Sequence, residues 1–166
     1  MRSVAARILD MLTDRLRDIR GQGDYVYDLQ GRIYLRRFSF DADIEDAPTV
    51  FIARRVGGGT ERVQKPGAEQ LSDTTVVFDV VGVVALDSTA SVAAENLIAD
   101  LQRALERPDD LFLRDCDGSG RALLSQELQI VSIETAQPLD GFPFEVVAVG
   151  VQCTWPHKYG DPNHVA

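Results

Sequence analysis

Residues 74–86 read TTVVFDVVGVVAL, and this stretch decides the fold. Alternate side chains of a β-strand point to opposite faces of its sheet, and here both sets are apolar apart from Asp79. Residues 144–155, FEVVAVGVQCTW, repeat this two-sided pattern. Strands that are apolar on both sides are covered on both faces. Both faces of these two strands therefore need cover.

Two amphipathic helices are predicted, over about 3–20 and 89–107. In both segments, apolar residues recur at spacings of three and four, which places them on one side of a helix. Gly21 ends the first helix, and Pro108 ends the second because proline cannot continue it.

The order of the elements indicates the fold class. Further β-like runs occupy 32–40, 49–56 and 125–135, so that three strands lie between the helices and two follow them. Sequential strands with few crossover helices favour an α+β fold. We predict a mostly antiparallel (mixed) β-sheet with the two α-helices packed on one face.

Length and composition fit a single domain over residues 1–166, with a mobile loop at 57–73 and a C-terminal tail from about 156. The net charge of −9 argues against a general binder of nucleic-acid phosphates, which needs clustered Lys and Arg. Cys116 and Cys153 are expected to be free thiols. We expect neither an export signal nor a membrane span.

The helices cannot cover both faces of the two long strands. A helix of 16 residues is about 24 Å long, whereas a strand of 13 residues reaches about 43 Å. Another copy of the chain is one candidate cover, because exposed apolar sheet promotes aggregation. The alternative is that the loop at 108–124 folds back over the second face.

The segment 115–120, DCDGSG, imitates the start of a calcium loop, with Asp115, Asp117 and Ser119 as the calcium-like candidates. The twelfth position of that loop needs a bidentate glutamate, but Gln126 occupies it. The segment also precedes a strand rather than a helix. We interpret it as a polar turn and expect no metal site.

No other motif indicates a cofactor or a reaction. The spacing of Cys153, His157 and His164 matches no zinc knuckle, and no serine occupies a nucleophile elbow. The glycines at 57–59 lack the spacing of a phosphate-binding loop. We therefore predict that the chain is not an enzyme, with a small calcium-binding or enzymatic domain as an alternative.

Two basic pairs lie at strand positions of an otherwise acidic chain. Arg36, Arg37, Arg54 and Arg55 either face solvent or meet acidic surface on a neighbouring subunit, since arginine pairs well with carboxylates. Trp155 and Tyr159, near the end of the chain, either cap the core or anchor a partner. These six residues are the candidates for a subunit or partner interface.

Several segments carry a family resemblance through their order. They are VAARILDMLTDRLRDI, APTVFIARR, TTVVFDVVGVVAL running into TASVAAENLIADLQRALER, and FEVVAVGVQCTWPHKYGDP. Together they resemble the tail terminator proteins of long-tailed bacteriophages. The resemblance implies an α+β subunit that forms a hexameric ring, caps the finished tail tube, ends its polymerisation and joins it to the head.

The implied partners are further copies of the chain, the tail tube protein, and a head-tail connector or neck protein. DNA would pass through the ring without specific binding, which suits an acidic subunit. The implied location is the virion tail or neck, after assembly in the host cytoplasm. Another head-tail connector or tail-tube component is the alternative within this class. The segment 108–124 departs from the resemblance.

Overall fold

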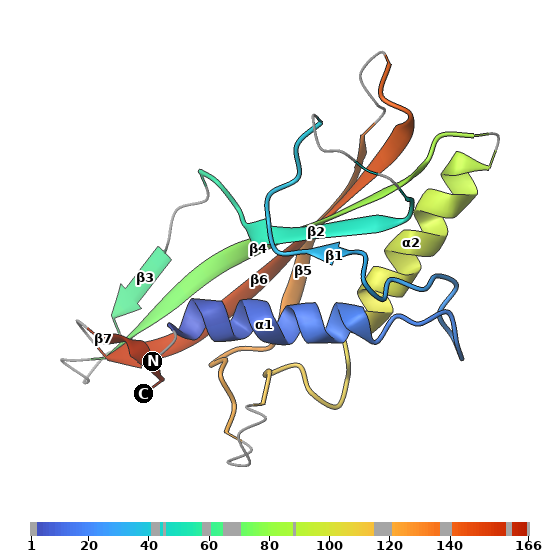
Figure 1. Ribbon diagram of the computed structural model, residues 1–166. Coiled ribbons are helices and arrows are strands. Elements are labelled where there is room, and N and C mark those ends of the chain that lie inside the picture. Colours follow the sequence, from blue (N-terminus) through green and yellow to red (C-terminus); the bar gives the residue numbers. More distant parts are fainter. Residues whose placement is uncertain are drawn as a thin grey trace.

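The computed structural model describes residues 3–40, 44, 46–57, 61–64, 71–87, 89–114, 121–136, 141–158 and 161–165 (Figure 1). Helices and strands follow the chain in the order α1 (Val4–Arg17), β1 (Ile33–Tyr34), β2 (Thr49–Arg54), β3 (Glu61–Gln64), β4 (Leu71–Ala85), α2 (Ala90–Leu105), β5 (Gln129–Ala136), β6 (Phe144–Lys158) and β7 (Asp161–Val165).

One sheet contains all of these strands. Its main order is β1-β2-β4-β6-β5, while β3 also pairs with β4 and β7 with β6. The pair β1–β2 is parallel and the other pairs are antiparallel. The sequence prediction of an α+β fold with a mostly antiparallel mixed sheet and both helices on one face is confirmed.

The two strands that decide the fold form the spine of this sheet. They pair without interruption from Leu71 opposite Lys158 to Ala85 opposite Phe144. A strand of 15 residues is about 50 Å long, whereas α2, with 16 residues, is about 24 Å long. Figure 1 shows the end of the spine beside β3 and β7 running past the helices.

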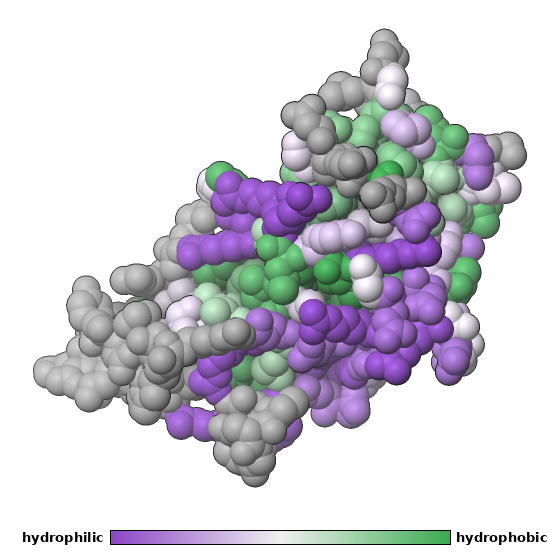
Figure 2. Space-filling model, in the orientation of Figure 1, coloured by the Kyte–Doolittle hydropathy of each residue, from purple (hydrophilic) through white to green (hydrophobic). Residues whose placement is uncertain are grey.

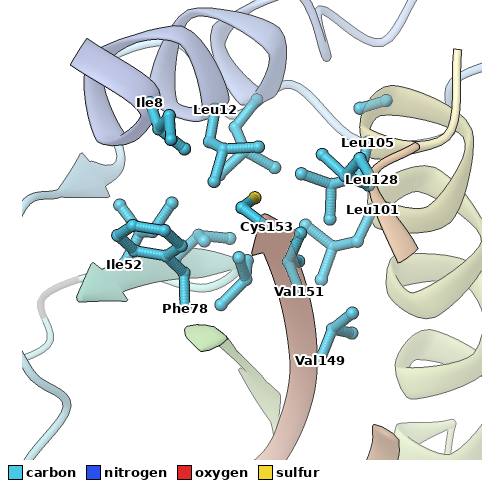
Figure 3. Close-up of a cluster of buried hydrophobic side chains, with 14 of the residues drawn as sticks. Ile8, Leu12, Ile52, Phe78, Leu101, Leu105, Leu128, Val149, Val151 and Cys153 are labelled. Carbon is cyan, nitrogen blue, oxygen red and sulfur yellow. The ribbon is translucent and has the colours of Figure 1, made fainter. Parts of the chain in front are cut away.

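The larger core lies between the spine and the helices. Ile8 and Leu12 of α1 and Leu101 of α2 close over Cys153 and its neighbours on β6 (Figure 3). Gly82 lets α2 approach β4, because a methyl group at this position would come within 2.6 Å of Leu97 Cδ2. Most of the chain's hydrophobic burial is therefore on the helix side of the sheet.

The outer surface on the helix side is mixed in character. Figure 2 shows apolar surface gathered between α1 and the strands β1 and β2, with hydrophilic side chains bordering it. Partly buried Ala5, Leu9 and Ile33 pack against the core from these elements. None of the described helices is long and apolar enough to cross a membrane.

Three segments differ from the predictions. The expected strand 32–40 is reduced to two residues, because 35–40 leaves the sheet edge. The expected loop 57–73 contains β3, whose pairing with β4 extends the sheet, and β4 already begins at Leu71. The expected tail from 156 instead continues β6 to Lys158 and returns as β7.

The loop 108–124 does not cover the second face of the sheet in its described parts, 108–114 and 121–124. Leu113, Leu123 and Leu124 are buried in the core on the helix side. Ser125 then donates its backbone N–H to the carbonyl of Thr154 at 2.8 Å, which attaches the segment to the edge of β6. The sequence alternative in which this loop covers the second face is wrong for these residues.

Candidate functional site: the open face of the sheet

The face of the sheet opposite the helices, called the open face below, has its own composition. It presents the odd-numbered residues of β4, such as Val77 and Val81, beside the even-numbered residues of β6, such as Ala148. These three side chains are partly exposed. The two-sided apolar pattern of the sequence therefore produces one covered face and one face that the helices leave free.

A cluster of aromatic rings covers one end of the open face. Phe51 of β2 packs with buried Val83 and Val146, and Phe38 lies over them with a ring centroid 5.5 Å from that of Phe51. Phe142 continues the cluster at 6.1 Å from Phe38. Because Phe38 comes from the expected strand 32–40, that segment supplies cover for the open face instead of a sheet edge.

Arg36 is held on this cluster by its aromatic neighbours. Its guanidinium carbon lies 5.4 Å from the centroid of Tyr34 and 5.4 Å from that of Phe51. A cation at this distance from a ring face is attracted to the ring's π electrons. The two rings therefore fix the orientation of the Arg36 side chain, and its charge stays at the surface.

Arg55 crosses the middle of the open face. It donates from Nε to Asp79 Oδ1 at 2.8 Å and from Nη2 to Ser132 Oγ at 3.0 Å. Between these partners it passes over Gly150 of β6. The side chain thus links the end of β2 to β4 and β5, and its acidic partner lies in the same chain.

Arg36, Arg37 and Arg54 surround a depression of about 190 Å³, called the basic notch below. Phe51 and Val81 are among its apolar lining. Asp79 also lines the notch, but its ion pair with Arg55 offsets its charge. The notch therefore combines net positive charge with apolar surface, and sequence reasoning identified its arginines without their common location.

Trp155 occupies the helix side of the sheet rather than a contact surface. It is 6% exposed and belongs to the larger core, so Trp155 caps the core. The structure thereby corrects the alternative in which Trp155 anchors a partner. Tyr159 and the calcium-like candidates Asp115, Asp117 and Ser119 lie outside the described residues. Within the described residues, no group of three His, Cys, Asp or Glu could hold a metal ion.

Cys153 is an unreactive thiol in this structure. Burial raises its pKa to about 12, with an opposing contribution from Arg15. The thiolate is the nucleophilic form of cysteine, so this residue stays protonated and inert at neutral pH. Figure 3 shows its sulfur directed toward Leu12 and the rest of the core.

A scan against models of known protein families gives no match for this chain. A search of curated proteins gives no significant match either. The features that bear on function are therefore the open face, the basic notch and the edges of the sheet.

Proposed function

We propose that the chain is a structural virion protein of a long-tailed bacteriophage. It assembles as a ring, with six copies as the expected number, on the end of the tail tube. There it ends tube polymerisation and provides the joint to the head through a connector or neck protein. It acts by surface complementarity, without a catalytic step or a cofactor.

The observation that carries the proposal is the two-sided apolar spine with its open face. The aromatic cluster covers Val83 and Val146 at one end. Farther along the same face, Val77, Val81 and Ala148 stay partly exposed among the described residues. Val77 and the neighbours Val81 and Ala148 lie on either side of the Arg55–Asp79 ion pair. Exposed apolar side chains on a sheet face that no helix covers favour an interaction site, and neighbouring copies in a ring would cover them.

The charge of the chain supports the same role. A ring that joins head and tail must let DNA pass without holding it. With a net charge of −9, the chain repels phosphates at long range. The arginines of the basic notch lie on an acidic molecule, which suits a contact with protein carboxylates better than a general grip on DNA.

Electron microscopy of phage particles made with and without the protein tests the proposal. Tails of uncontrolled length in its absence would support capping. Tails of normal length that fail to join heads would instead support the alternative of a connector or neck protein. Normal tails joined to heads would contradict both roles.

Purified components give a second test. Added to polymerising tail tube protein, the chain should stop tube growth and appear as a ring at one tube end. Heat-denatured chain serves as the control for non-specific effects. Unchanged tube lengths at a molar excess of the native chain would contradict capping.

A further inference from the structure

The charges on the two edges of the sheet are complementary. On the β2 side, Arg36 and Arg37 at the basic notch have no hydrogen-bond or ion-pair partner among the described residues. The other arginines with described side chains each have an interaction within the chain. Arg36 and Arg37 therefore place two positive charges without an ion-pair partner among the described residues at this edge.

The opposite edge carries an acidic groove of about 380 Å³ between the end of α2 and the start of β5. Glu106 and Glu127 are exposed there and have no side-chain partner among the described residues. Leu111, Leu128 and Ile130 give the groove an apolar lining. This groove thus pairs free negative charge with apolar surface, as the notch pairs positive charge with it.

The notch and the groove lie on different faces of the sheet. The notch is on the open face over β2 and β4. The groove is on the helix face, because Leu128 and Ile130 pack with the core there. In the strand order, the spine separates β2 from β5. Two copies can therefore overlap at their edges. The open face at the β2 edge of one copy then lies against the helix face at the β5 edge of the next copy.

An apolar side chain and the charged pairs match across this overlap. Val56 lines the notch and is 62% exposed, so it can enter the apolar lining of the groove. Arg36 and Arg37 then face Glu106 and Glu127 of the next copy, and arginine forms strong charge-assisted hydrogen bonds with carboxylates.

We infer that the basic notch of one copy binds the acidic groove of a second copy. The two surfaces differ, so the contact is head-to-tail, and repetition of such a contact closes a ring when the rotation between copies allows it. This inference rests on the proposed function for the ring itself and adds the two surfaces that build it.

Charge-swap variants of the full chain test the contact by sedimentation velocity at low salt. R36E/R37E and E106R/E127R should each weaken self-association at least about tenfold, because like charges then face each other. The two variants mixed in equal amounts should associate again, since the reversed notch of one fits the reversed groove of the other. The quadruple variant R36E/R37E/E106R/E127R should associate on its own.

A matched control reverses exposed charges outside both surfaces. R20E/E95R should associate like the unchanged chain, and circular dichroism should show that all variants are folded. Three results would overturn the inference: an unchanged chain that stays monomeric at its highest soluble concentration, folded charge-swap variants that associate normally, or folded variants whose mixture does not recover.

The tube assay separates this inference from the proposed function. Rings that respond to the charge swaps but do not stop tube growth would refute capping and leave the contact standing. If the chain stops tube growth but the charge swaps do not change its self-association, the contact is refuted and capping is still supported.

Discussion

Arg55 occupies the space that a side chain at Gly150 would fill. A methyl group at position 150 would come within 2.6 Å of Arg55 Nη2 and would also overlap Ser132 Oγ. The glycine on β6 therefore lets the guanidinium cross the open face from β2 to reach Asp79 and Ser132. One missing side chain thus makes a polar link across four strands possible.

Gly150→Ala should destabilise the fold by about 1–2 kcal/mol, because the added methyl group displaces Arg55 or Ser132 from their mutual hydrogen bond. Urea denaturation measures this change as a lower midpoint with an unchanged slope.

The cause can be isolated with a double-mutant cycle. In an R55A/S132A background, the added methyl group has no guanidinium to displace. The loss of unfolding free energy caused by Gly150→Ala should therefore fall to less than half of its value in the unchanged chain. An equal cost in both backgrounds would show that the methyl group acts on the backbone rather than on Arg55.

Arg15→Met should destabilise the fold by about 2–3 kcal/mol. Arg15 is 5% exposed and donates to the carbonyl of Leu105, at the end of α2, at 2.7 Å. It also forms an ion pair with Asp110 at 2.8 Å. Methionine would leave both acceptors without this donor in a largely buried site. Thermal denaturation of Arg17→Met, at an exposed position on the same helix, should show a change of less than about 0.5 kcal/mol.

Asp100→Ala should release the segment before β1 from α2. The Asp100 side chain is fully buried, and its carboxylate accepts the backbone N–H groups of Val26 and Tyr27, each at 2.9 Å. We expect a cost of about 2–3 kcal/mol and faster hydrogen exchange at these two amides. Glu95→Ala, at an exposed site of α2, should leave the stability of the fold and the hydrogen exchange of these amides unchanged.

The Tyr27 phenol gives an independent measure of the same carboxylate. Its pKa is raised first by burial and then by the negative charges of Asp100 and Asp87. Asp100→Asn removes one of these charges and should lower the Tyr27 pKa, as measured by NMR titration. A Tyr27 pKa that stays constant in this variant would show that the charge of Asp100 does not raise it.

The regular elements could be predicted because their signals are local. The helical periodicity and the stop residues located α1 and α2 to within three residues at each end. The apolar alternation located the spine, because both of its faces are buried or partly buried over most of its length. Local pattern thus determined both the fold class and its central pair of strands.

The open face could not be predicted in detail because contacts distant in sequence form it. Phe38 and Phe40 alternate as they would in a strand, yet they turn onto Phe142, about a hundred residues away. Arg55 finds Asp79 and Ser132 only through the order of β2, β4, β6 and β5 in the sheet. Sequence identified the arginines as candidates, but the sheet topology separates Arg55 from the notch residues Arg36 and Arg37.

Cys153 should make the stability of the fold depend on pH in the alkaline range. Burial raises its pKa from the usual 9.0 to about 12 in the folded state. Between these values the unfolded chain loses the thiol proton and the folded chain keeps it, so stability is fully present below about pH 9 and falls as pH rises toward 12. Urea denaturation at several pH values measures the slope.

Cys153→Ala should reduce this alkaline loss of stability while lowering stability overall, because it removes buried volume beside Leu12 and Val151. Reaction with a thiol reagent gives the matching kinetic result. In a Cys116→Ser background at pH 8, Cys153 should react at the rate of unfolding, and urea should accelerate the reaction. Rapid labelling of the native chain would contradict the buried, protonated thiol.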